Sequence, residues 1–277
     1  MLSNNYKLAL TTQGPTYPPS EIVDKDGNFV VIGMINFADE AGRLQQEWNA
    51  AIVASDSPLP EFGKNLPYKI IKKIDLKNLK STDDCVLYAL PLPLPCNNYP
   101  MTFAPEQLPV IHSRSHCPLH EVPIPDLRAQ DGRKVTQPIK LSDWIRAEGE
   151  LQVTLVQNQT AAVFDFTFNR LIPNSLYTIM ALRQFDLDPV RGPTRPGPLG
   201  VPNVFITDNE GRGSYSAMMP NPFPAAEKGN RIINVVVLWM STQMSYGGAI
   251  GHYGLGGDIH AQLKLPGRFF LEFTTHD

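Results

Sequence analysis

The sequence predicts a mostly β protein: an antiparallel Greek-key β-sandwich with a small N-terminal α+β subdomain and long proline-rich loops. Three observations predict this fold class. Residues 235–240 are continuously apolar, which is typical of a strand covered on both faces. Residues 258–265 alternate between polar and apolar with the two-residue period of a strand. Proline accounts for 26 of the 277 residues, well above the average of roughly 5%, and disfavours long helices.

The chain is expected to divide into three parts: a strand-and-helix subdomain over residues 1–90, a proline-rich crossing segment over 91–140 and the β-sandwich domain over 141–277. This length provides enough apolar material for one large domain or two smaller ones. The crossing segment begins PLPLPCNNYP, and such a density of proline excludes a regular helix or a central strand. We therefore expect this segment to run extended over the surface.

The N-terminal part is expected to hold strands over 28–36, 68–74 and 86–90, and one helix. Asp39 suits the N-cap of this helix, because its side chain can accept a hydrogen bond from the first turn. The apolar residues that follow recur at helical spacing on one face: Leu44, Trp48, Ala51 and Ile52.

The C-terminal part opens with a short predicted helix, with Ser142 as its N-cap and Gly149 as its C′ residue. Strands follow, and the clearest core signal is the alternation that places Phe164, Phe166 and Phe168 on one face. The expected strands are 151–156, 161–168, 176–182, 203–206, 214–219, 235–240, 258–265 and 269–273.

Charge and hydropathy exclude some functional classes. A formal net charge of −3 provides no basic footprint for nucleic acid or an anionic membrane. No window approaches the roughly 18 apolar residues of a membrane span, and no signal peptide is visible. We expect a soluble protein of unknown compartment, with a mature secreted or periplasmic form left open. The chain has three cysteines: Cys85, Cys96 and Cys117. The sequence is equally compatible with a Cys85–Cys96 disulfide or with three reduced thiols.

About half of the chain, residues 141–265, carries motifs such as LIPNSLYT and YGLGGDIHAQLKL. These motifs resemble a group of bacterial β-sandwich proteins with no established activity. The L-x-P-N-x-x-Y-T turn is also distantly similar to the superoxide-dismutase-like sandwich of CHRD domains. The resemblance implies a fold and no activity. The His-x-His pair of CHRD domains is missing after Tyr177, which argues against a dismutase-type copper site.

A candidate metal site lies in the sequence HSRSHCPLH, which we call the histidine segment (residues 112–120). Its possible ligands are His112, His116, Cys117 and His120. Imidazole and thiolate are the usual ligands of zinc and copper, so one such ion is a possible cofactor. Against this, Pro118 prevents a regular helix and no zinc-finger spacing matches. The alternative is a polar loop whose histidines bond to backbone.

A second candidate site surrounds the loop between residues 247 and 257, which contains six glycines. His252 and His260 flank its tip, and Asp258 shares a strand face with His260 and could fix the imidazole tautomer. These three residues are the catalytic candidates, and a solvated strand face is the alternative. The candidate ligand-binding residues are Tyr246, His252, Tyr253 and Trp239. If the crossing segment packs over this face, the histidine segment and His260 share one site.

The leading functional hypothesis is a protein that binds a small ligand or a metal through its long loops, since loops on a rigid β scaffold commonly carry such sites. The first alternative is an enzyme, metal-dependent or cofactor-independent, that uses histidines on a small apolar molecule. The second is a structural or assembly protein, for which a homo-oligomer is possible. No nucleotide cofactor is expected, because the glycine-rich loop lacks GxxxxGK[ST] and precedes a strand.

Overall fold

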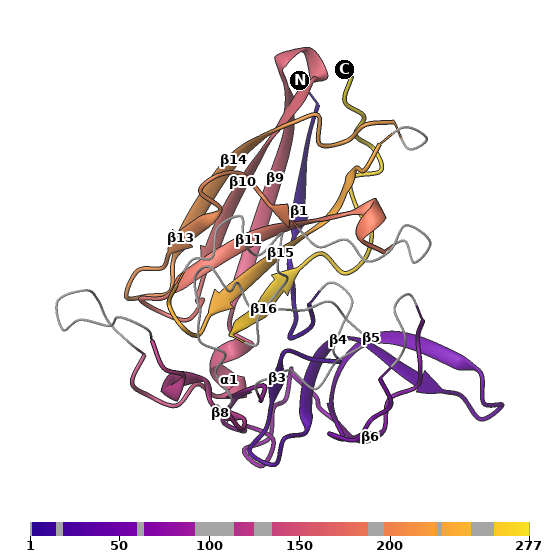
Figure 1. Ribbon diagram of the computed structural model, residues 1–277, viewed down its shortest axis with the longest axis vertical. Helices are drawn as coiled ribbons and strands as arrows, with labels where there is room; N and C mark the ends of the chain where they lie inside the picture. The colour runs from indigo at the N-terminus through magenta and orange to yellow at the C-terminus, as the bar shows by residue number, and fades with distance from the viewer. Residues whose placement is uncertain are drawn as a thin grey trace.

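Antiparallel strands in three sheets make up the protein, which confirms the predicted mostly β class (Figure 1). The computed structural model describes residues 2–14, 19–59, 64–91, 114–124, 135–187, 197–225, 229–244 and 258–276. The helical elements of this part are short: η1 (Leu119–Glu121), α1 (Leu141–Trp144), η2 (Gln157–Gln159) and η3 (Gln184–Leu187). None of the helices in these ranges is long and apolar enough to cross a membrane.

Two of the sheets form the sandwich in the upper part of Figure 1. Sheet A has the strand order β1 (Ser3–Lys7), β9 (Glu148–Val156), β10 (Ala161–Asn169) and β14 (Gly213–Pro220). Sheet B has the order β12 (Gly197–Pro198), β11 (Leu176–Arg183), β15 (Ile232–Met240), β16 (Ile259–Lys264) and β2 (Ala9–Leu10), with β13 (Val204–Ile206) also paired to β11. The N-terminal strands β1 and β2 therefore complete both sheets of the sandwich.

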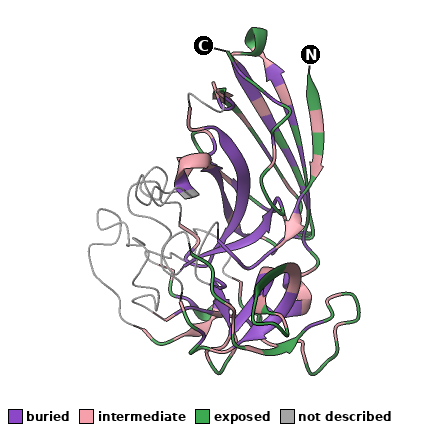
Figure 2. Cartoon of the chain, turned by 90° about the vertical axis from the view of Figure 1, so that its right-hand side faces the viewer, coloured by how far each residue is buried: buried purple, intermediate pink, exposed green. Residues whose placement is uncertain are grey.

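The core lies between these two sheets. Phe164, Phe166 and Phe168 of β10 are at most 2% exposed and face it, as the alternation predicted. Tyr177 of β11 and Val237 of β15 meet them from sheet B in the same apolar cluster. Burying each such side chain contributes about 1.5–3 kcal/mol. Figure 2 shows the buried positions concentrated on the long strands, while the N-terminal strand and the turns are largely exposed.

The third sheet, sheet C, lies below the sandwich in Figure 1. Its order is β6 (Ile70–Lys73), β5 (Leu44–Val53), β4 (Phe29–Ala38), β3 (Ile22–Val23), β7 (Tyr88–Ala89) and β8 (Cys117–Pro118). Ala50 and Ile52 of β5 join the main core, whereas Ala51 and Val53 on the opposite face join a smaller cluster. Apart from 161–168, which is β10, and 269–273, the predicted strands correspond to β4, β6, β7, β9, β11, β13, β14, β15 and β16.

The helix predicted after Asp39 is wrong, because this segment is the strand β5. It pairs with β4 over ten residues, from Ala38 opposite Leu44 to Phe29 opposite Val53. Asp39 caps the connecting turn: its carboxylate accepts hydrogen bonds from the N–H groups of Ala41 (3.0 Å) and Arg43 (2.9 Å). The helical spacing of Leu44, Trp48, Ala51 and Ile52 is overridden because both faces of the strand are needed to bury apolar side chains.

Two other local predictions are also wrong. The short helix α1 begins after Lys140 rather than Ser142, and Gly149 lies within β9 instead of ending the helix. The predicted strand over 269–273 is irregular: Phe270 adopts a left-handed φ of 68°, which interrupts extended backbone. The rings of Phe270 and Phe273 are nevertheless fully buried against Phe223.

The alternation predicted for residues 258–265 is interrupted by a bulge in β16. Val237 pairs with Leu263 and Leu238 with Ala261, so one extra residue, Gln262, is accommodated. His260 then lies opposite Trp239, with their ring centroids 5.7 Å apart. Every residue of β16 is buried, so the strand has no solvated face.

Residues 8–13 join the sandwich to sheet C, and we call them the junction segment. The Thr11 N–H donates to the Gln262 carbonyl of β16 (2.9 Å), and the Thr12 N–H donates to the Ile32 carbonyl of β4 (3.0 Å). The Gln13 side-chain amide bonds to the backbone of β4: its Oε1 accepts a hydrogen bond from the Met34 N–H (2.7 Å). Gly33 makes this possible, because a Cβ at that position would lie 2.1 Å from the same oxygen.

The Tyr177 hydroxyl ties the junction segment to the sandwich interior. It donates to Gln262 Oε1 (2.7 Å) and accepts from the Ile172 N–H (2.9 Å). Gln262 Nε2 donates to the Trp144 carbonyl (3.1 Å), and the Trp144 indole N–H donates to the Thr11 carbonyl (3.0 Å). These buried groups form one continuous chain of hydrogen bonds.

Replacing Tyr177 by Phe should lower the free energy of unfolding by about 1–3 kcal/mol, because two buried partners lose their hydrogen bonds while the ring is kept. Urea denaturation measures this change. Tyr88→Phe is the control: the ring is half-buried beside His116, and the expected change is within about 0.5 kcal/mol. Equal stabilities of the two variants would contradict the role assigned to the Tyr177 hydroxyl.

Candidate functional site

His260 is fully buried and held through both ring nitrogens. Its Nδ1 lies 3.0 Å from the Glu21 carbonyl oxygen and its Nε2 lies 3.0 Å from Ser241 Oγ. A carbonyl oxygen only accepts, so Nδ1 carries the proton and Nε2 is the acceptor. Burial lowers the pKa of His260 to about 4, so the ring is neutral near pH 7.

The Ser241 hydroxyl faces the free lone pair of this neutral imidazole, as a nucleophile faces its base, but its single proton is shared with a second acceptor, the Asp258 carbonyl oxygen. Both residues are buried in this structure. Ser241 is 3% exposed and His260 0%, so neither is presented to a substrate from solvent. Ser241 Oγ also lies 3.0 Å from the Asp258 carbonyl oxygen, and the Ser241 N–H donates to the same oxygen at 3.0 Å. The pair fixes the end of β15 against the start of β16.

Glu21 and Lys264 are the other titratable groups of the same buried cluster. Glu21 Oε2 accepts from the Ala261 N–H (2.7 Å), while Oε1 has no hydrogen-bond partner among the described residues. Burial raises the pKa of Glu21 to about 8 and lowers the pKa of Lys264 to about 8. Lys264 Nζ lies 3.3 Å from the Gln13 carbonyl oxygen and 5.5 Å from the ring centre of Trp48.

Asp258 is close to His260 in sequence, but its carboxylate forms an ion pair with Arg114. Arg114 belongs to the histidine segment, so this pair brings one end of that segment to β16. The segment's histidines have other partners. His116 Nε2 lies 2.8 Å from the Lys25 carbonyl oxygen, and His120 Nε2 lies 3.6 Å from the Glu121 carboxylate.

The predicted metal ligands are therefore only partly located. His116, Cys117 and His120 lie within the described residues, and Cys117 belongs to β8. His112 lies outside the described residues. Within the described part of the chain, no three His, Cys, Asp or Glu side chains are gathered as a metal site would require. Metal binding stays a prediction.

Trp239 is the one predicted ligand-binding residue within the described ranges; Tyr246, His252 and Tyr253 lie outside them. Its indole is 1% exposed and packs edge-to-face on Trp144, with the ring centroids 6.3 Å apart. The structure thus places Trp239 in the core, beside His260.

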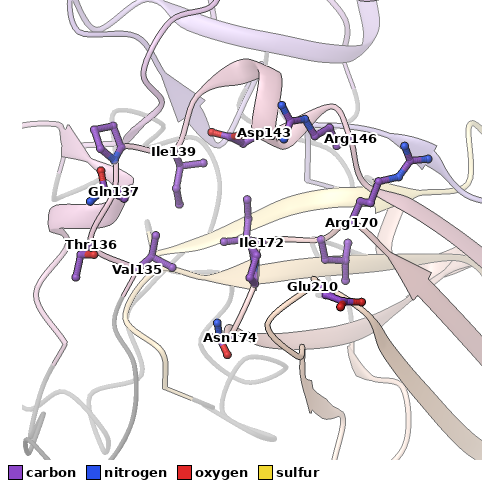
Figure 3. A pocket seen from close by; sticks show the side chains of 13 residues that line it. Val135, Thr136, Gln137, Ile139, Asp143, Arg146, Arg170, Ile172, Asn174 and Glu210 are labelled. Carbon is purple, nitrogen blue, oxygen red and sulfur yellow. Dashed lines mark ion pairs between the residues drawn. The ribbon is translucent and has the colours of Figure 1, made fainter.

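A cavity of about 520 Å³ lies at the other end of the Tyr177 hydrogen-bond chain. Figure 3 shows its apolar side chains Val135, Ile139 and Ile172 grouped between α1 and the turn after β10. We call it the turn pocket. Its lining comes from three stretches of chain: residues 135–146, residues 170–174 and Glu210. The volume falls within the range of small-molecule sites, about 300–1,000 Å³.

The wall of the turn pocket over residues 171–174 is fixed by hydrogen bonds. The Leu171 N–H donates to the Gly211 carbonyl (3.0 Å), and the Ile172 N–H donates to Tyr177 Oη. Thr207 Oγ1 donates to the Ile172 carbonyl (2.7 Å). Gly211 has a φ of 73°, and a Cβ there would lie 2.2 Å from the Leu171 carbonyl oxygen, so glycine is required. This wall is therefore formed before any ligand arrives.

Charged residues border the turn pocket: Asp143, Arg146, Arg170 and Glu210. Arg170 pairs with Glu148, and Glu210 pairs with Arg212 at 2.7 Å. Arg146 is less engaged: its closest described acid is Asp143, at 3.9 Å, and its side chain is 64% exposed. This guanidinium can still receive an anion.

The pocket residues were not predicted as a site from the sequence, although signals for its parts are present. The turns at 171–174 and 208–211 are both readable from Pro, Asn, Asp and Gly. That they lie side by side follows from the pairing of β11 with β13, which single-sequence patterns do not reveal.

Comparison with known proteins finds no matching family model, no matching curated protein and no matching solved structure. What the protein does is therefore inferred from its own residues.

Glu21→Gln should show a pH-dependent effect on stability. In the wild type the folded chain keeps the Glu21 proton while the unfolded chain releases it, so this stabilisation is complete below about pH 4.5 and is lost as pH rises through about 8. Glutamine does not titrate. The free energy of unfolding of the variant minus that of the wild type should therefore increase as pH rises between these values, as measured by urea denaturation at several pH values.

His260 titrates in both proteins and largely cancels in this difference. Burial lowers the pKa of Lys264 to about 8 and the Glu21 charge raises it, so the difference is read below that pH. The matched control is Glu40→Gln, because Glu40 is an exposed carboxylate in the β4–β5 turn. A difference for Glu21→Gln that is constant with pH would show that the carboxyl is ionised in the folded chain.

Proposed function

We propose that the protein binds a small amphipathic ligand in the turn pocket. What supports this most is the pocket's construction: a cavity of about 520 Å³ whose wall at Leu171 and Ile172 is held by buried hydrogen bonds. Such preformation avoids the entropic cost of ordering a loop on binding. The proposal agrees with the small-ligand hypothesis from the sequence and makes its ligand class more specific.

The lining indicates the chemistry of the ligand. Its deep part is apolar, with Ile139 and Ile172 both buried, so it suits a hydrocarbon or aromatic body. Arg146 stands at the border with its guanidinium available to an acceptor. A carboxylate, sulfonate or phosphate at the end of the ligand would gain a charge-assisted hydrogen bond there. We therefore infer an apolar body with one anionic end.

Two fluorescent probes test this proposal: 8-anilinonaphthalene-1-sulfonate and N-phenyl-1-naphthylamine, which has the same ring system without the sulfonate. Thr136→Trp places a large ring at an exposed position of the pocket lining and should abolish binding of both. Arg146→Gln should weaken binding of the sulfonate roughly tenfold, which equals about 1.4 kcal/mol, and leave the neutral probe unchanged. Fluorescence titration measures both constants.

Lys77→Trp is the matched control, since it adds the same ring to an exposed turn of sheet C. It should bind both probes like the wild type. If Thr136→Trp also binds like the wild type, the probes occupy another surface and the proposal fails. Equal weakening of both probes by Arg146→Gln would retain the pocket and reject the anionic end.

A further inference from the structure

The free edge of β14 differs from the other sheet edges of the described chain. It is eight residues long, and its register with β10 is unbroken from Ala161 opposite Pro220 to Phe168 opposite Gly213. Its sequence, GSYSAMMP, contains no charged residue. Sheet edges are usually protected by lysine, bulges or shortness, because a regular edge pairs with other strands.

The other edges carry these protections. In sheet A, β1 has five residues and ends in Lys7, and in sheet C, β6 has four residues that include Lys72 and Lys73. The edge strands β2, β8 and β12 have two residues each and β13 has three, and the part of β5 that β6 leaves unpaired, residues 44–50, carries Glu47. Figure 1 shows β14 at the outer side of sheet A. Among the described strands, β14 is therefore the edge best suited to intermolecular pairing.

The hydrogen-bond pattern shows which groups this edge offers. The Asn221 N–H donates to the Thr160 carbonyl (2.8 Å), so odd-numbered positions of β14 bond to β10. Even-numbered positions then point their N–H and C=O groups away from the sheet: those of Ser214, Ser216 and Met218. Pro220 is also an even-numbered position. Because proline has no N–H, it fits a position whose N–H would not bond to β10.

We propose that two copies of the chain pair β14 to β14 in antiparallel orientation, about a two-fold axis at Ser216. The outward groups then match: Ser216 exchanges hydrogen bonds with its own copy, and Ser214 does so with Met218 of the second copy. On the inner face Tyr215 lies opposite Ala217, a large residue opposite a small one, and the Tyr215 hydroxyl stays hydrogen-bonded to carbonyl oxygens of its own chain. Without charges on the strand, no like charges meet across the axis. The two copies of sheet A become one continuous sheet.

The mass in solution provides the first test. Light scattering on the full chain should approach twice 30.8 kDa as concentration rises. Ser216→Lys places two ammonium groups opposite each other at the axis and should restore the monomer mass at every concentration. Ser216 is exposed and its hydroxyl donates to the exposed Asp165 carboxylate (2.5 Å), which can pair with the new ammonium, so the fold should tolerate this change. Thr167→Lys, on an exposed position of the inner strand β10, is the control and should remain dimeric. A wild type that stays at 30.8 kDa overturns the proposal.

Cysteine cross-linking tests the register. In a hydrogen-bonded antiparallel pair the Cα atoms lie about 5.5 Å apart, within disulfide reach. Under mild oxidation Ser216→Cys should therefore form a covalent dimer, whereas Ser214→Cys, which faces Met218 of the second copy, should not. A dimer in which both variants cross-link equally, or in which neither does, would place the contact elsewhere and reject the β14 axis.

Discussion

The relative placement of the sandwich and sheet C depends on one constraint: polar groups buried between them must find hydrogen-bond partners. Thr11 and Thr12 are fully buried, and their backbone groups bond to β16 on one side and β4 on the other. An unpartnered buried polar group costs about 1–3 kcal/mol. Sliding one sheet against the other would break several of these bonds together, so a single arrangement is selected.

The same burial explains why the most reactive-looking residues are used for architecture. His260 and Ser241 have the spacing of a catalytic pair, and Glu21 and Lys264 have pKa values displaced toward neutrality. Perturbed titratable groups often mark active sites, but structural networks perturb pKa values by the same desolvation. Exposure separates the two cases, since His260 has no accessible surface while the turn pocket opens between three stretches of chain.

The pocket nevertheless depends on the junction segment. The Thr11 carbonyl holds the Trp144 indole, Gln262 holds the Trp144 backbone, and Tyr177 connects Gln262 to Ile172 in the pocket wall. Buried hydrogen bonds in a medium of low dielectric are strong and directional, so such a chain fixes distant groups relative to each other. The rigidity of the pocket wall is thus set partly by residues that never contact a ligand.

The sequence predicted the fold where one local pattern was sufficient and failed where distant residues decided. The alternation of Phe164 to Phe168 needs only a neighbouring layer, and it was confirmed. The helix after Asp39 was wrong because pairing with β4 outweighs helical spacing. The solvated strand face considered as the alternative for residues 258–265 is not observed, because every residue of β16 is buried. The turn pocket could not be predicted as a site at all. Its turns were readable, but it exists only because β13 pairs with β11 and brings residues 208–211 against Leu171. A site made from turns that are distant in sequence becomes visible only when the strand pairing is known.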